Sequence, residues 1–157
     1  MELFHASKRI FSIGEVVPSG NISTFYPVAS NEMDGRKPND APSRRTALFC
    51  ADSEEFAVYF LKMEKVPEDE INLYKVKVNT FHRAPFSITH VVEQKLNSGE
   101  SVEALIEEYW NPNKEWNYYE YLVPEFEVIE ILQKPALNEI ILVHRSTQDH
   151  ALAKSIS

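Results

Sequence analysis

Glycine is scarce in this chain of 157 residues, which contains only four. No two of them lie close enough to form a G-x-G-x-x-G turn or a P-loop, the two common glycine-rich cradles for nucleotide phosphates. If this protein binds a nucleotide, it therefore holds the phosphates without a glycine-rich loop.

Cysteine and net positive charge are also lacking. The single cysteine, Cys50, excludes an internal disulfide and a multi-cysteine metal site. The formal net charge of −8, from 16 basic and 24 acidic residues, disfavours a surface that coats nucleic acid, while leaving room for a local basic patch. No stretch approaches about 18 apolar residues, and the start Met-Glu-Leu-Phe-His lacks the basic region of a leader. We expect a cytoplasmic protein without a membrane segment.

The composition is that of a folded domain, with 43% hydrophobic and 25% charged residues. The length predicts a single domain over residues 1–157. The polar tail after about residue 145 is expected to fray. Residues 14–45 contain four prolines and three of the four glycines, which predicts a long loop that covers a site.

Apolar runs and alternating patterns predict six strands and two short helices. One helix follows Asp52, which forms a capping box with Glu55, and the other ends at Asn111. Because strands and helices do not alternate regularly, the expected fold class is α+β. The predicted strands cover residues 2–6, 46–51, 71–78, 118–123, 126–132 and 139–143.

His5 lies inside the first predicted strand, in F-H-A-S. A histidine in such a position can be a core residue that bonds to the backbone. Alternatively, His5 and Ser7 point to one face of the strand and hold a polar ligand such as a ribose.

Glu120 lies in the aromatic strand N-Y-Y-E-Y-L-V-P. It is either an exposed glutamate on a solvated face or a carboxylate on the floor of an aromatic cleft. In the second case it can stabilise positive charge that develops on a sugar.

Three segments occur in an order that resembles the ADP-ribosyltransferase superfamily, in its diphtheria-toxin-like and poly(ADP-ribose) polymerase branch. They are L-F-H-A-S near the start, A-L-F-C-A-D-S-E-E-F-A-V-Y-F in the middle and Y-E-Y-L-V-P toward the end. The last segment also looks like the E-x-L-V-P strand of DNA-targeting ADP-ribosyltransferase toxins. The resemblance implies a split β-sheet core with a few short helices and a long loop over the cleft.

The resemblance implies a role for each matching residue. His5, with Ser7 beside it, matches the histidine that binds the adenosine-side ribose of NAD, the substrate. Phe49 falls where the branch usually has the tyrosine that packs on nicotinamide, and Tyr59, or Phe60 in the neighbouring register, matches the second aromatic residue. Glu120 matches the catalytic glutamate, which holds the 2′-hydroxyl of the nicotinamide ribose.

Two departures from the family pattern limit this comparison. Tyr118 stands where arginine-modifying members carry Glu or Gln, which disfavours that acceptor class. Phe49 replaces the tyrosine of the usual His-Tyr-Glu triad. Arg44 and Arg45 either grip the pyrophosphate of NAD or are solvated loop charges.

Other chemistry-bearing residues predict no further site. The remaining histidines are scattered without zinc-binding spacing, so no metal is expected. Cys50, in an apolar strand, is expected to be a buried and inert thiol. An aromatic cluster that includes Trp110 and Trp116 is either core or the flank of an acceptor entrance.

The expected function is that of a mono-ADP-ribosyltransferase, a glycosyltransferase that cleaves NAD and transfers ADP-ribose to a protein or nucleic acid. A toxin-like or phage–host conflict role, with a cognate antitoxin or inhibitor as partner, is an expectation by analogy alone. Two alternatives remain: an NAD-dependent RNA 2′-phosphotransferase-like enzyme, and an inactive binding or immunity module of the same fold.

Overall fold

The computed structural model describes residues 1–22 and 25–157, and these residues contain seven strands and five α-helices. The strands are β1 (Glu2–Ser7), β2 (Val16–Pro18), β3 (Leu48–Cys50), β4 (Asn72–Lys77), β5 (His82–Pro85), β6 (Tyr119–Val123) and β7 (Glu125–Leu132). The helices are α1 (Pro27–Asp34), α2 (Glu54–Met63), α3 (Ile88–Asn97), α4 (Glu103–Trp110) and α5 (Glu139–Ser155), with a 3₁₀ turn at Glu68–Glu70. The prediction of an α+β fold is confirmed.

The strands form two small antiparallel sheets. One has the order β1-β4-β7-β2 and the other β3-β6-β5. They meet where Phe4 of β1 and Ala51, just after β3, exchange two backbone hydrogen bonds of 2.8 Å. The β1–β3 junction therefore joins the two sheets, and the region between the sheets beside this junction is called the split.

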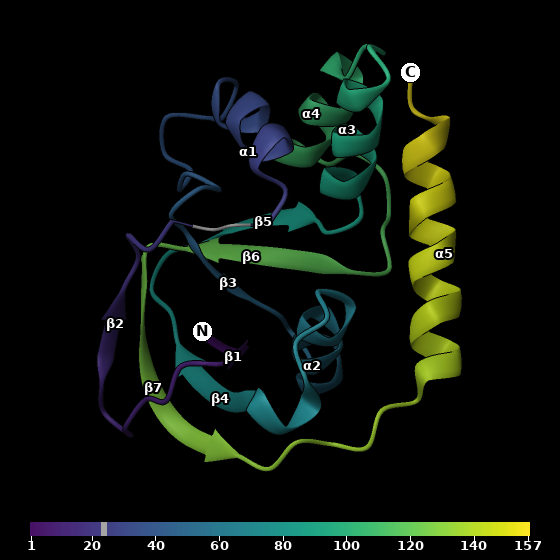
Figure 1. The fold of residues 1–157 in the computed structure, drawn as a ribbon. Coiled ribbons are helices and arrows are strands. Elements are labelled where there is room, and N and C mark those ends of the chain that lie inside the picture. Colours follow the sequence, from purple (N-terminus) through teal and green to yellow (C-terminus); the bar gives the residue numbers. More distant parts are fainter. Residues whose placement is uncertain (23–24) are drawn as a thin grey trace.

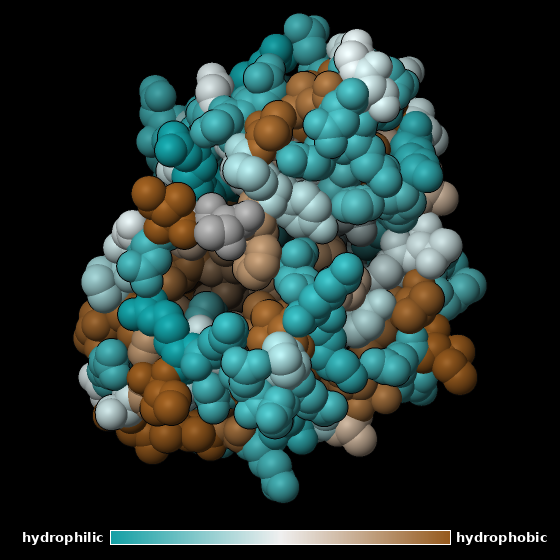
Figure 2. All heavy atoms as spheres, viewed as in Figure 1, coloured by the Kyte–Doolittle hydropathy of each residue, from teal (hydrophilic) through white to brown (hydrophobic). Residues whose placement is uncertain are grey.

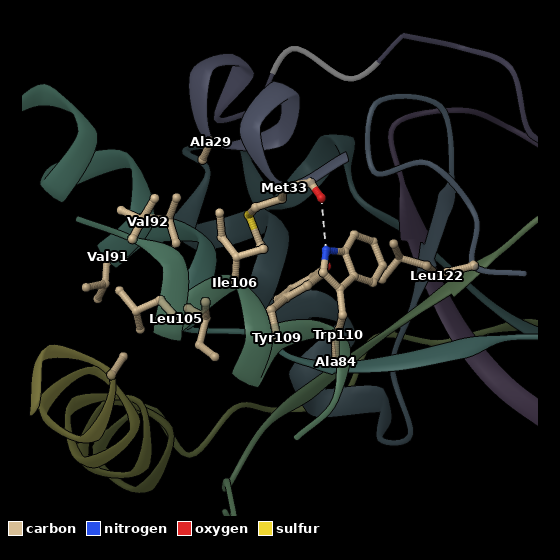
Figure 3. Packing of buried hydrophobic residues seen from close by; sticks show 14 of the residues in the cluster. Ala29, Met33, Ala84, Val91, Val92, Leu105, Ile106, Tyr109, Trp110 and Leu122 are labelled. Atoms are coloured by element: carbon tan, nitrogen blue, oxygen red, sulfur yellow. Dashed lines mark hydrogen bonds between the residues drawn. The ribbon is translucent and has the colours of Figure 1, made fainter. Parts of the chain in front are cut away.

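A helical layer covers the smaller sheet. Helices α1, α3 and α4 lie together on the side of β5 and β6, and α5 runs along the outside of the molecule (Figure 1). Side chains of α1, α3 and α4 converge in a buried cluster, where the indole N–H of Trp110 donates to the carbonyl of Met33 at 2.9 Å (Figure 3). Trp116 is buried in the same cluster, so both tryptophans belong to the core.

The C-terminal segment is a helix, which corrects two predictions. Residues 139–143 form the start of α5 instead of a strand, and the tail after residue 145 continues that helix instead of fraying. The Asn138 side chain accepts from the Ile141 N–H and begins the helix. Asp149, which is buried, accepts from the N–H groups of Asn117 and Tyr118 at 2.9 and 3.0 Å. These bonds attach α5 to the chain entering β6.

The predicted loop over residues 14–45 is only partly a loop. It contains β2 and α1, while its residues 23–24 lie outside the described residues. The structure also adds β5 and α3, which the sequence patterns did not predict. Helix α2 begins as expected, but its cap is Ser53, whose hydroxyl accepts from the Phe56 N–H at 3.1 Å, in place of Asp52.

Candidate functional site

His5 lies at the split between the two sheets. Its ring is 9% exposed and packs beside Phe126, with the ring centroids 4.8 Å apart. Its Nδ1 is 2.7 Å from the Phe49 carbonyl oxygen. Because a carbonyl oxygen only accepts, Nδ1 is the protonated nitrogen and donates this bond. The His5 ring thus bridges β1 to β3 just past the Phe4–Ala51 bridge.

The His5 contact predicts a pH-dependent stability. Burial lowers the pKa of His5 from 6.5 to about 4. Between these values the unfolded chain binds the proton and the folded chain does not, so stability is full above pH 6.5 and falls as the pH drops toward 4. At about 1.4 kcal/mol per pKa unit, we expect a loss of about 3 kcal/mol by pH 4 from this group. Urea unfolding at several pH values measures it.

The matching variant for this measurement is His5→Gln, whose side-chain amide can donate to the Phe49 carbonyl but does not titrate. The difference in the free energy of unfolding between the two proteins is expected to vary with pH only in the acid window. Parallel pH profiles for both proteins would contradict the assignment of the effect to His5.

Beyond the bridge, the backbone of Ala6 faces the split. Both backbone groups of Phe4 bond across to Ala51. Hydrogen-bonding directions alternate along an antiparallel strand, so the N–H and C=O of Ala6 turn to that same side. His5, one residue earlier, turns its backbone toward β4, where it pairs with Tyr74. At this strand edge the Ala6 N–H can donate to the oxygen of a planar amide group, and the Ala6 C=O can accept from its nitrogen.

Aromatic side chains surround this part of the split. They line a small cavity of about 20 Å³ together with Ala6 and Glu120. The Phe60 and Phe86 rings meet edge to face with their centroids 5.1 Å apart, and Phe60 is only half-buried. Hydrophilic residues cover most of the face seen in Figure 2, which also shows a hollow lined by hydrophobic residues. The aromatic residues of the cavity are Phe4, Phe49, Phe56, Phe60 and Phe86.

Glu120 forms a buried polar network with two residues from other elements. Its Oε1 lies 2.5 Å from Arg44 Nη1 and accepts from the Tyr109 hydroxyl at 2.7 Å. Arg44 Nη1 also donates to the Tyr109 hydroxyl at 2.6 Å, and its Nε donates to Ser30. The side chains of Arg44 and Glu120 are each 5% exposed. The interpretation of Glu120 as an exposed glutamate is wrong, and so is that of Arg44 as a solvated charge.

The electrostatics of this network favour an ionised pair. Burial raises the pKa of Glu120 above its ordinary value, and the Arg44 guanidinium and the Tyr109 hydroxyl offset only part of this rise. Burial is the largest effect on the pKa of Arg44 and lowers it, but the charge of Glu120 and the interactions with Tyr109 together offset burial and raise the pKa above its ordinary value. Because Arg44 stays charged, an ionised Glu120 is the state that leaves no unpaired charge inside the protein. Arg44 also lies over the Phe49 ring, 5.0 Å from its centroid.

A larger cleft adjoins this network on the side of α5. It has a volume of about 440 Å³ and lies between α2, α3 and α5. A second small cavity, of about 20 Å³, is lined by Arg44 and Glu120 and shares Tyr26, Phe86 and His90 with the cleft. Glu120 therefore lines both small cavities, and the second of them shares part of its wall with the cleft.

The structure brings some predicted site residues together and separates others. Phe49, Phe60 and Glu120 line the aromatic cavity, whereas Tyr59 lines the cleft. The His5 side chain lies on the opposite face of β1, beside Phe126.

Ser7 and Arg45 do not line the aromatic cavity, whereas Cys50 does. Ser7 Oγ accepts from the Arg9 N–H, and Ser7 lines neither the aromatic cavity nor the cleft. Arg45 is exposed, in contrast to its buried neighbour Arg44. Cys50 is buried, and burial raises the pKa of its thiol, as expected of an inert cysteine.

Two members of the site escaped the sequence analysis. Tyr109 is not among the residues that the sequence singles out, although its hydroxyl bonds to Arg44 and Glu120. Phe86 lies in a segment for which the sequence predicted no element. A tyrosine on an apolar helix face is a weak signal, because a buried hydroxyl needs a partner that the sequence does not reveal.

Comparison with known proteins adds no identification. No family model matches the chain, and no curated protein sequence matches it.

Within residues 1–22 and 25–157, no helix is long and apolar enough to span a membrane. The same residues contain no cluster of three His, Cys, Asp or Glu side chains suited to a metal ion.

Proposed function

We propose that the protein is a mono-ADP-ribosyltransferase that binds the nicotinamide end of NAD in the aromatic cavity and transfers ADP-ribose to a macromolecular acceptor. The observation that carries the proposal is the buried Glu120 carboxylate beside an aromatic cavity at the split between the sheets. Aromatic rings suit the nicotinamide ring, and the edge N–H and C=O of Ala6 suit its carboxamide.

Glu120 supplies the electrostatic part of the reaction. When the bond between nicotinamide and the ribose C1′ breaks, its electron pair goes to the nicotinamide nitrogen and positive charge develops on the sugar. A fixed carboxylate stabilises that charge, because it needs no reorientation during the step. Among the described residues, both hydrogen bonds to Glu120 end on Oε1, which leaves Oε2 to accept from a ribose hydroxyl. Arg44 and Tyr109 hold the carboxylate in place.

One observation favours the second candidate, an inactive binding module. The charge of Glu120 is already balanced by Arg44, and the aromatic cavity of about 20 Å³ is smaller than a nicotinamide ring. In the enzyme, the half-buried Phe60 ring must move aside as the ligand enters. A module without catalysis would keep the rings packed as they are.

Filling the cavity tests whether NAD binds there. Ala6→Leu adds three carbons next to the rings, and we expect it to weaken NAD binding at least tenfold, as measured by calorimetry, while the protein stays folded. The matched control is Ala136→Leu, which makes the same change at an exposed position outside the cavity and keeps wild-type affinity. Equal affinity of both variants would place NAD elsewhere, and no binding by the wild type would remove the enzyme proposal.

A further inference from the structure

The cleft beside α5 contains buried polar groups that lack partners. Ser146 Oγ, in the wall of the cleft, is buried without a hydrogen bond among the described residues. Thr89 Oγ1, which is buried in the adjoining cavity next to Arg44 and Glu120, has no partner in that part of the chain either. Buried hydroxyls are nearly always satisfied in folded proteins, so two such groups along one path point to a ligand that supplies the missing bonds.

Glu64 adds a carboxylate to the same cleft. It follows the last turn of α2, is half-buried and accepts a hydrogen bond from the Tyr26 hydroxyl. No ion pair joins it to a lysine or arginine within residues 1–22 and 25–157, in contrast to Glu120. Burial, with a smaller effect of the Glu120 charge, raises the pKa of Glu64. The two carboxylates thus differ in environment, one paired and one able to take a proton.

Tyr26 connects the two carboxylates. Its backbone has φ of 50°, a left-handed conformation that non-glycine residues rarely adopt. It precedes Pro27, which disfavours the α-helical region for this residue. In this position its ring lines both the cleft and the small cavity at Arg44 and Glu120. Strained residues of this kind concentrate at functional sites, and here the strain places a hydrogen-bond donor on Glu64.

We propose that the cleft receives the acceptor of the transfer reaction, a hydroxyl-bearing protein side chain, and that Glu64 accepts its proton. This inference rests on the proposed function. In the step, the acceptor oxygen forms a bond to the ribose C1′ as the bond to nicotinamide breaks. The electron pair of that bond leaves with nicotinamide, and the hydroxyl proton moves to the Glu64 carboxylate.

The lining of the cleft favours a hydroxyl over other acceptors. No lysine or arginine of the described residues lines the cleft, so the phosphates of a nucleic acid would meet Glu64 and the net charge of −8 without a counter-charge. A neutral hydroxyl fits the hydroxyl and imidazole groups already present, which are those of Ser87, Ser146, Thr147, His90 and His150.

Transfer and cleavage are measured together on the full chain to test this assignment. Wild type and Glu64→Gln are incubated with NAD and with one of three acceptors, and released nicotinamide and transferred label are both counted. The acceptors are a synthetic peptide with serine as its only nucleophilic side chain, a peptide with arginine instead, and a single-stranded DNA oligonucleotide. Glu55→Gln is the matched control, because Glu55 is exposed on α2 outside the cleft.

We expect the wild type to label the serine peptide and Glu64→Gln to transfer about 100-fold less label per nicotinamide released. Glu55→Gln should match the wild type. Equal transfer by Glu64→Gln would overturn the role of Glu64. Preferential labelling of the arginine peptide or the DNA, or nicotinamide release without any labelling, would overturn the acceptor class. Absence of nicotinamide release by the wild type would instead overturn the proposed function, and this inference with it.

Discussion

Replacing Glu120 alone is expected to destabilise the protein more than replacing Glu120 and Arg44 together. Glu120→Met leaves the Arg44 guanidinium buried without a counter-charge, since both side chains are 5% exposed and joined at 2.5 Å. Breaking such a pair costs about 3–5 kcal/mol, whereas replacing both members by apolar residues of similar size is often neutral or stabilising. We therefore expect Arg44→Met/Glu120→Met to recover most of the free energy of unfolding lost in the single variant, as measured by urea denaturation.

Arg45→Met is the matched control for this cycle, because Arg45 is the exposed neighbour of Arg44. Its effect on stability should lie within about 0.5 kcal/mol of zero. If the losses from Arg44→Met and Glu120→Met simply add in the double variant, the two side chains are not coupled and the buried ion pair is not the support of this site.

The largest expected effect on activity comes from Glu120→Gln. The amide keeps the shape of the side chain and an oxygen that accepts from Tyr109, but it removes the negative charge that the developing sugar cation requires. Loss of one fixed electrostatic group in an active site typically lowers turnover by about 100- to 1,000-fold. We expect a loss of this size in nicotinamide release at saturating NAD, with a much smaller change in NAD affinity measured by calorimetry.

Glu108→Gln provides the control for damage to folding. Glu108 is also a buried carboxylate, but it accepts from the Asn113 and Lys114 N–H groups and the Trp116 indole, and it does not line the aromatic cavity. Per folded molecule, this variant should release nicotinamide at the wild-type rate. An equal loss in both variants would mean that Glu120 acts through stability alone.

Periodicity predicted most of the strands but not the C-terminal helix. Residues 71–78 alternate as a half-exposed strand should, and β4 lies there. The run E-I-I-L-V at 139–143 is equally apolar and rich in β-branched residues, yet it begins α5. Its conformation depends on the Asn138 cap and on the Asp149 bonds to the segment before β6, and the latter contacts join residues about 30 positions apart. The hydrophobic pattern of residues 139–143 carries no information about contacts between residues so far apart in the chain.

The part of the candidate site that could be predicted is the part in which one unusual residue within one strand is informative by itself. A glutamate within an aromatic strand marked Glu120 as a candidate. The family resemblance left Tyr59 and Phe60 as alternatives, and of these two Phe60 lines the aromatic cavity while Tyr59 lines the cleft. The partner of Glu120 was not predictable, because Arg44 lies 76 residues earlier and reaches it only through tertiary packing. The position of His5 was also open, since its bond to the Phe49 carbonyl depends on how β1 meets β3.

The most direct test of the account is nicotinamide release from NAD by the unaltered protein under substrate excess, followed over several turnovers with a serine-containing peptide as acceptor. The account predicts release well above the rate in buffer, in multiple turnovers per protein molecule. Release at the buffer rate by folded protein that binds NAD would contradict catalysis at Glu120 and leave the fold as a binding module.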